Sequence, residues 1–279
     1  MNLTILIESA ERRFRQILED FFVSVYDERK LCSHGINHHR RVWGFAREIL
    51  SLHPITDSLS PACDPEKLII ACYLHDIGMS ADPGPRHGKK SRELCQNFLE
   101  KCNLDPDNFT DLLETIENHD YKDYVSDISE SSLLRVLSLA DDLDAFGYTG
   151  IYRYSEIYLK RGISPSELGY RILDNAQSRF DNFKRALSAD YEYVSRHRVR
   201  YEILDDFFLN YNKQAKAYNF ETDYPSGYCG VVQLFMLMIR MNLSVSGFFD
   251  EAGRHSQDSI IAAYLKGLQT EFSAYNKDE

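Results

Sequence analysis

The chain has 279 residues, of which 43% are hydrophobic and 27% charged, and its 43 acidic side chains against 32 basic ones give a net charge of −11. This composition is typical of a soluble globular protein with a sizeable core, and the negative charge argues against non-specific binding to nucleic acid or to an anionic membrane. The longest strongly apolar region, residues 231–241, is interrupted by Gln233 and Arg240 and is too short to span a bilayer. Because the N-terminus lacks signal-peptide features and the six cysteines contain no CxxC pair, we expect a cytoplasmic protein with reduced thiols.

Apolar residues at helical spacing follow one another along the chain. The first stripe runs from Ile7 to Phe22, and Asp64 and Asp105 each precede a proline and an acidic residue, which is a typical helix start. No segment alternates apolar and polar residues as a half-buried strand does, so the sequence predicts an all-α fold. The remaining stripes of the first half span residues 38–52, 66–77, 87–102, 106–119 and 130–145.

The second half keeps the helical pattern but differs in composition. It is rich in tyrosine and phenylalanine, and it holds only two of the nine histidines, His197 and His255. Aromatic stripes at helical spacing usually serve packing. We therefore expect one helical domain over residues 1–162 and an aromatic-rich helical extension over residues 163–279, which packs on the first domain or forms a subunit contact such as a homodimer interface.

Several polar residues of the first half fall on apolar helix faces. His38 and His119 each share a face with apolar neighbours, and His75 and Asp76 end the apolar run that starts at Ile69. A buried carboxylate without a partner costs several kcal/mol. One inward histidine is more often a hydrogen-bonded core residue than a ligand, but inward histidines and carboxylates on four helices together indicate a bound cation.

Two aspartates stand side by side near the end of the stripe at residues 130–145. Asp141 follows Leu134 and Leu137 at helical spacing and is expected to face inward. Asp142 falls with the polar residues of the same segment, so we expect it to face solvent.

In order, spacing and helical setting, these residues resemble the H…HD…D pattern of the HD-domain metal-dependent phosphohydrolases, over roughly residues 20–160. The first histidine of that family commonly stands in an HxxRV context, and residues 38–42 read HHRRV. The central dipeptide stands in YLHDIG and the last aspartate in LADDLDAFGYTGIYR. The resemblance implies an HD-type helical bundle with a divalent metal held by His38, His75, Asp76 and Asp141, and it makes His39 the runner-up to His38.

The resemblance leaves the number of metals open at one or two per chain. His87 and His119 match histidines that complete a second metal site in binuclear members, or act as acid and phosphate ligand in mononuclear ones. The chain lacks the adjacent histidine pair that some binuclear phosphodiesterases of the family carry after this position. Imidazole ligands favour Mn, Fe, Co, Ni or Zn over Mg.

A phosphohydrolase also needs groups around the metal that hold the phosphate. For each basic candidate the alternative is a solvated surface charge. Asp144 is a candidate for orienting a ligand or a helix end, and His34 for reaching the substrate or for shaping the helix entry. The basic candidates are Arg41, Lys89, Lys90 and Arg153.

The resemblance thus predicts a phosphohydrolase acting on a small phosphorylated substrate, with a nucleotide as the leading candidate and metal-activated water as the nucleophile. Two other classes stay open. A di-iron oxygenase on the same scaffold would need both His87 and His119 as iron ligands, and a slow or non-catalytic HD sensor would use residues 163–279 as a partner surface. The residues expected to take part in catalysis are Asp76, His87, His119, Arg41, Lys89 and Arg153.

Overall fold

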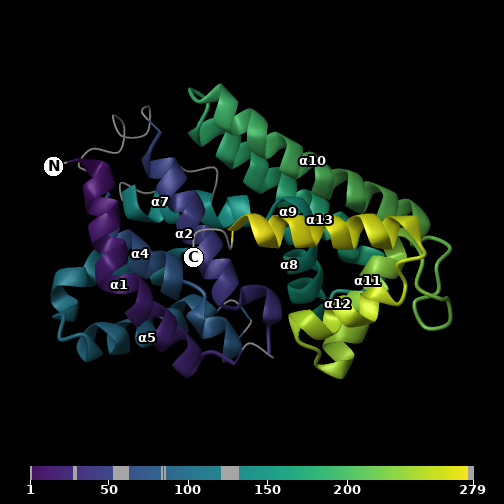
Figure 1. The fold of residues 1–279 in the computed structure, drawn as a ribbon, viewed down its shortest axis with the longest axis horizontal. Coiled ribbons are helices and arrows are strands. Elements are labelled where there is room, and N and C mark those ends of the chain that lie inside the picture. Colours follow the sequence, from purple (N-terminus) through teal and green to yellow (C-terminus); the bar gives the residue numbers. More distant parts are fainter. Residues whose placement is uncertain are drawn as a thin grey trace. The chain divides into compact units, whose positions relative to one another are not determined.

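The computed structural model describes residues 2–27, 30–52, 63–82, 84, 86–120 and 132–275. Within these ranges the regular elements are α-helices and short 3-10 helices, without a β-strand, which confirms the all-α prediction (Figure 1). Among the described helices none is both long and apolar enough to cross a membrane.

Contacts divide the chain into two compact units. Unit 1 contains Met1–Glu28, His34–Leu143 and Leu187–Asp190, and unit 2 contains Arg29–Ser33, Asp144–Ala186 and Tyr191–Glu279. A contact-based unit need not be an independently folding domain. The domain boundary expected after residue 162, which falls inside unit 2, therefore stays a prediction.

Unit 1 is built around helix α4, which packs against α1, α2 and α6. From Leu68 to Leu74 every residue of α4 has 0% exposure, so the segment is buried on all sides. The chain leaves this buried helix at His75 and Asp76, which carries both residues into the interior. The helices of this unit are α1 (Leu3–Val25), α2 (Ile36–Leu50), α4 (Pro65–Leu74), η2 (Ile77–Ser80), α5 (His87–Lys101), η3 (Pro106–Phe109), α6 (Thr110–Asn118) and α7 (Ser132–Asp144), whose last residue belongs to unit 2; η1 (Cys32–His34) precedes α2.

Two predicted helix starts behave differently. Asp64 accepts a hydrogen bond from the Glu66 backbone N–H at 2.9 Å, and α4 begins at the following proline, as predicted. Asp105 makes the same contact with the Asp107 N–H at 3.1 Å but caps only the 3-10 turn η3. Phe109 then leaves the helical conformation at φ −122° and ψ 22°, so the helix expected from residue 106 begins at Thr110 instead.

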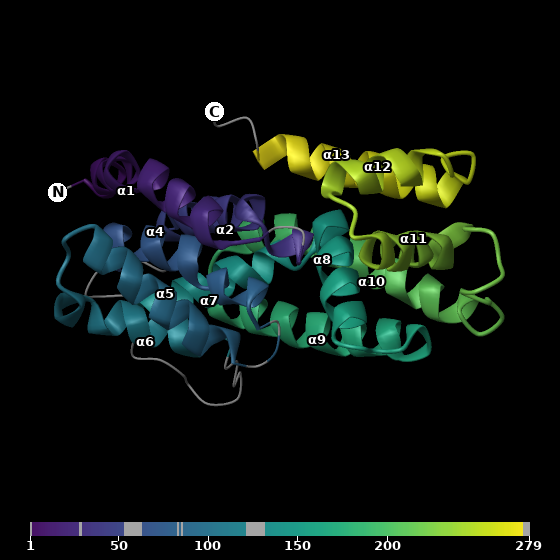
Figure 2. The ribbon, with the colours of Figure 1, turned by 90° about the horizontal axis from the view of Figure 1, so that it is seen from below.

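Unit 2 consists of longer helices with an aromatic core. Helices α9 and α10 run side by side along most of their lengths (Figures 1 and 2), and the rings of Phe180 and Tyr201 stack between them at 4.3 Å. Phe235 and Phe248 stack in the same way at 4.8 Å. These aromatic residues therefore serve packing within unit 2. Its helices are α8 (Gly147–Lys160), α9 (Pro165–Ala186), α10 (Tyr191–Gln214), α11 (Gly227–Met241), α12 (Val245–Gly253) and α13 (Ser259–Tyr275).

Candidate metal centre

Four of the expected residues meet in the interior of unit 1. His38 comes from α2, His75 and Asp76 from the end of α4, and Asp141 from the last turn of α7. All four are buried, and one potential ligand atom from each lies within 4.8 Å of the others. We call this cluster subsite 1.

The distances in subsite 1 suit a single cation. The Nε2 atoms of His38 and His75 are 3.2 Å apart, and Asp76 Oδ2 lies 3.6 and 3.4 Å from them. Asp141 Oδ1 lies 3.9 and 4.0 Å from the same two nitrogens. Ligand atoms about 2.0–2.2 Å from one metal are themselves about 3–4 Å apart. The donor set therefore fits a divalent metal with little movement.

A second cluster uses the other oxygen of Asp76. Asp76 Oδ1 lies 3.0 Å from His119 Nε2 and 3.3 Å from His87 Nε2, and these two nitrogens are 3.3 Å apart. We call this cluster subsite 2. The structure thus brings His87 and His119 to the centre, with the Asp76 carboxylate between the two subsites.

Subsite 2 has one more carboxylate nearby, which the sequence analysis missed. Asp120 Oδ2 lies 3.9 Å from His87 Nε2, although its side chain is 46% exposed. Residues 119–120 form a second His-Asp dipeptide in the sequence. This second copy of the dipeptide found at residues 75–76 could have pointed to Asp120.

Two glycines allow α5 to approach its neighbours closely enough to form subsite 2. A Cβ on Gly78 would lie 2.5 Å from the carbonyl oxygen of His87, and a Cβ on Gly88 would lie 2.3 Å from that of Glu117. The Gly78 N–H also donates a hydrogen bond to Ser91 Oγ at 2.9 Å. Side chains at these two positions would separate α5 from η2 and α6.

Backbone carbonyls orient three of the histidines. The Nδ1 atoms of His75, His87 and His119 lie 3.0, 2.7 and 2.7 Å from the carbonyl oxygens of Cys72, Gly84 and Ile116. Since a carbonyl oxygen only accepts, each contact places a hydrogen on Nδ1 and leaves Nε2 for the subsites when the ring is neutral. This is the usual arrangement around histidines that bind metals.

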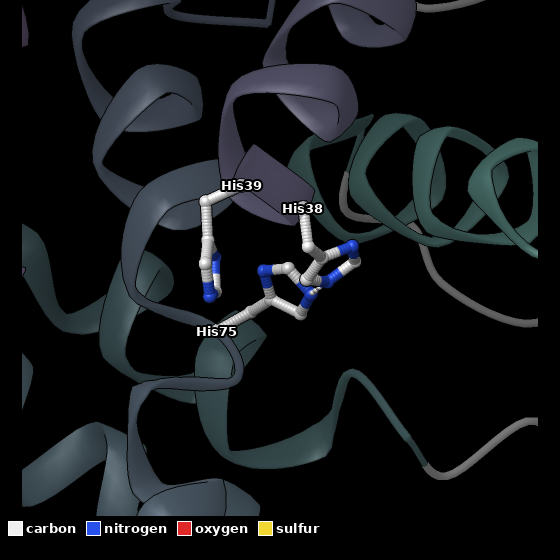
Figure 3. A group of neighbouring side chains, drawn as sticks. All are labelled: His38, His39 and His75. Atoms are coloured by element: carbon white, nitrogen blue, oxygen red, sulfur yellow. Dashed lines mark hydrogen bonds between the residues drawn. The ribbon is translucent and has the colours of Figure 1, made fainter. Parts of the chain in front are cut away.

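His39, the runner-up to His38, is also buried, with 0% exposure. Figure 3 shows His38 and His75 meeting through one ring nitrogen each, with the ring of His39 to one side. His39 Nδ1 lies 3.0 Å from the same Cys72 carbonyl that His75 contacts. One potential ligand atom each of His38, His39 and His75 also lies within 4.8 Å of the others, so the geometry leaves His39 close to the centre.

The electrostatics of the centre favour a cation. Burial by itself raises the pKa of Asp76, but His75 and hydrogen bonds from His119 and His38 hold it well below its usual range, so the group is a carboxylate. Burial lowers the pKa of His87, while the carboxylate of Asp76 outweighs this effect and raises the pKa to about 9. Protons thus compensate the buried negative charge when no metal is bound, and a divalent cation would take their place.

The prediction that Asp142 faces solvent is wrong. Asp142 has 0% exposure, and Asp141, Leu143 and Asp144 around it are buried as well. Arg135 and Ser138, on the same face earlier in the helix, are half-buried. The last turn of α7 is buried on every side, so this face is no longer in contact with solvent at Asp142.

The structure places the other candidates at different kinds of position. His34 Nε2 lies 3.9 Å from Asp76 Oδ2, and Arg41 is buried on α2. On α5, Lys89 is exposed, while Lys90 forms a surface ion pair with Glu93 at 2.8 Å. Their roles toward substrate stay predictions.

Arg153 and Asp144 were expected near the phosphate and beside a ligand or helix end, respectively. Both belong to unit 2, where Arg153 Nη1 forms a buried ion pair with Asp144 Oδ2 at 3.2 Å. This ion pair ties the end of α7 to the second turn of α8.

Comparison with known proteins gives one match. Residues 35–145 match the family model described as HD domain, whereas no curated protein and no solved structure matches the chain. HD domains are typically metal-dependent hydrolases. The matched segment holds all six residues of the two subsites. Residues 35–145 of this chain therefore match an HD domain, and their buried histidines and aspartates form a cluster that fits the metal site of such a domain.

Proposed function

We propose that the chain is a metal-dependent phosphohydrolase whose centre holds two divalent metals and hydrolyses a small phosphate ester, with a nucleotide as the leading candidate. The observation that carries this proposal is the position of Asp76. Its Oδ2 lies within 3.4–3.6 Å of His38 and His75, and its Oδ1 within 3.0–3.3 Å of His87 and His119. One carboxylate between two pairs of imidazoles is suited to bridging two cations.

The protein's own groups would supply the metal ligands. His38, His75 and Asp141 would hold one cation and His87 and His119 the other, with Asp76 shared between them. Imidazole nitrogens in both subsites favour Mn, Fe, Co, Ni or Zn over Mg. Divalent metals bound here would activate a water molecule as nucleophile and withdraw charge from the phosphoryl group.

Several side chains would act on the substrate. The protein carries a net charge of −11, so a phosphate group needs local positive charge in order to bind. Arg41 lies on α2 three residues after His38 and is buried with it, which makes it the leading candidate for holding a phosphate oxygen. His34, 3.9 Å from Asp76 Oδ2, is placed to hydrogen-bond a substrate or water beside subsite 1.

A di-iron oxygenase is the second candidate. It would need both His87 and His119 as ligands, and their Nε2 atoms, 3.3 Å apart, are close enough to bind one iron together. The ligand set suits iron as well as manganese or cobalt.

The test compares metal-loaded wild-type protein with Asp76→Asn. Release of p-nitrophenol is measured from p-nitrophenyl phosphate and bis(p-nitrophenyl) phosphate, and the products of a panel of nucleotides are separated and identified, with Mn²⁺, Co²⁺, Zn²⁺ or Fe²⁺. Oxygen uptake is followed for the iron form. We expect metal-dependent hydrolysis of a phosphate ester that Asp76→Asn abolishes. The exposed Asp20→Asn on α1 serves as the control and should behave as wild type. Oxygen uptake without ester hydrolysis would favour the oxygenase, and the absence of both would favour a sensor or binding module.

A further inference from the structure

Helix α1 lies outside the segment that matches the HD domain, yet it packs against α4 and α2 in unit 1. Glu19 on α1 faces both of these helices. Its Oε2 accepts a hydrogen bond from Arg40 Nη2 at 2.6 Å, and its Oε1 accepts from Arg40 Nε at 3.0 Å and from the Tyr73 hydroxyl at 3.0 Å. One carboxylate therefore links α1, α2 and α4.

Besides Arg15 on its own helix, Glu19 has two partners that are close in sequence to the metal-binding histidines. Arg40 follows His38 by two residues on α2, and Tyr73 precedes His75 by two residues on α4. The Nε2 atoms of His38 and His75 approach to 3.2 Å in subsite 1. A change in the spacing of α2 and α4 would alter this distance directly.

The buried hydroxyl of Tyr73 on α4 depends on Glu19 as its hydrogen-bond acceptor. Tyr73 has 0% exposure, so without an acceptor its hydroxyl would remain buried and unpaired. The Glu19 side chain is 13% exposed, and the two parallel hydrogen bonds from Arg40 fix its orientation. The same helix also places Phe22 against the His39 ring, with 4.6 Å between ring centroids.

We propose that Glu19 is a positioning residue of the metal centre, which fixes the spacing of α2 and α4 and thereby the approach of His38 and His75 in subsite 1. The inference rests on the proposed metal site but not on its substrate. Helix α1 then helps to position the metal ligands, although the HD-domain match begins only at residue 35.

Glu11 provides a matched control on the same helix. Its Oε1 accepts hydrogen bonds from Trp43 Nε1 at 2.7 Å and Arg47 Nη1 at 3.0 Å. Both partners lie on α2 and are further from His38 along the helix than Arg40 is. Within the part of the chain that the structure describes, Glu11 forms no hydrogen bond or ion pair with α4. Removing Glu11 should weaken the packing of α1 on α2 without releasing Tyr73.

The test measures Co²⁺ dissociation constants and the Co²⁺ absorption spectrum of wild-type, Glu19→Ala and Glu11→Ala proteins, together with the melting temperatures of their metal-free forms. We expect Glu19→Ala to raise the dissociation constant of subsite 1 by about 10-fold or more and to change its spectrum. Subsite 2 should change less than subsite 1, because its two histidines lie on α5 and at the end of α6 and only Asp76 follows α4. Glu11→Ala should lower the melting temperature but leave both dissociation constants within about 2-fold of wild type.

Two further variants keep the inference testable if Glu19→Ala folds poorly. Glu19→Gln retains an acceptor for Tyr73 and should recover part of the affinity. Tyr73→Phe removes the link to α4 alone and should weaken subsite 1, without adding to the effect of Glu19→Ala in the double variant. If wild-type protein binds Co²⁺ but these variants bind it as Glu11→Ala does, the inference is wrong and the metal site stands. If wild-type protein binds no metal, both fail.

Discussion

Gly88 offers a selective way to disturb one subsite and leave the other intact. An alanine Cβ at this position would lie 2.3 Å from the carbonyl oxygen of Glu117 and 3.4 Å from that of Ile116. Real Cβ atoms essentially never approach within 3.0 Å of such atoms. The α5 and α6 backbones would therefore have to separate by at least the difference, 3.0 − 2.3 = 0.7 Å.

This displacement is large compared with what a metal site tolerates. Metal–ligand distances vary by only about 0.2 Å, and subsite 2 takes His87 from the start of α5 and His119 from the end of α6. We expect Gly88→Ala to weaken metal binding at subsite 2 by about 10- to 100-fold, as other changes in ligand support do. Subsite 1 should keep its metal, because its ligands lie on α2, α4 and α7.

The assay is metal content after desalting, combined with calorimetric titration of the metal-free protein. Wild-type protein should bind two metals per chain and Gly88→Ala one. The control is Gly44→Ala on α2, where a Cβ would meet nothing within 4 Å. It should bind both metals and gain up to about 1 kcal/mol in stability from the better helix propensity of alanine. Two metals bound to Gly88→Ala with unchanged affinity would refute the assignment of subsite 2.

Three further predictions follow from the geometry and charges of individual residues. Asp76→Asn should remove both metals and Asp141→Asn only one, measured by elemental analysis; equal losses would contradict the shared position of Asp76. With metal present, Asp141→Asn should lower the melting temperature, and in chelator it should be neutral or stabilising, because a buried carboxylate without its cation is unfavourable. His197 should make unit 2 sensitive to acid: burial, reinforced by Arg200 and Arg196, lowers its pKa from the ordinary 6.5 to about 2. Below pH 6.5 the unfolded chain then binds a proton that the folded chain does not, which costs about 2 kcal/mol of stability between pH 7 and pH 5. His197→Gln should show a correspondingly smaller loss in denaturant unfolding at the two pH values, and an unchanged loss would mean that the folded protein also takes up this proton.

Much of unit 1 could be predicted from local sequence. The apolar run before His75 indicated a buried helix, and α4 is buried on all sides from Leu68 onward. The cap at Asp64 set the first residue of that helix correctly. Such features depend on residues within one or two turns of each other, so periodicity and capping chemistry are sufficient to recognise them. The same holds for His38 and Asp141, whose apolar neighbours on their own helices show that they face the interior.

Only the tertiary structure decided which groups meet and how closely. A helical pattern shows one apolar face, but other segments also cover the opposite side at the end of α7, and Asp142 is buried for that reason. Asp76 contacts the second pair of histidines only because α5 and α6 lie close to it. Gly78 allows α5 to approach η2, and Gly88 allows α5 to approach α6. Glu19 reaches Tyr73 across 54 positions of the chain. Contacts between residues so distant in sequence arise from packing, and no local pattern specifies them.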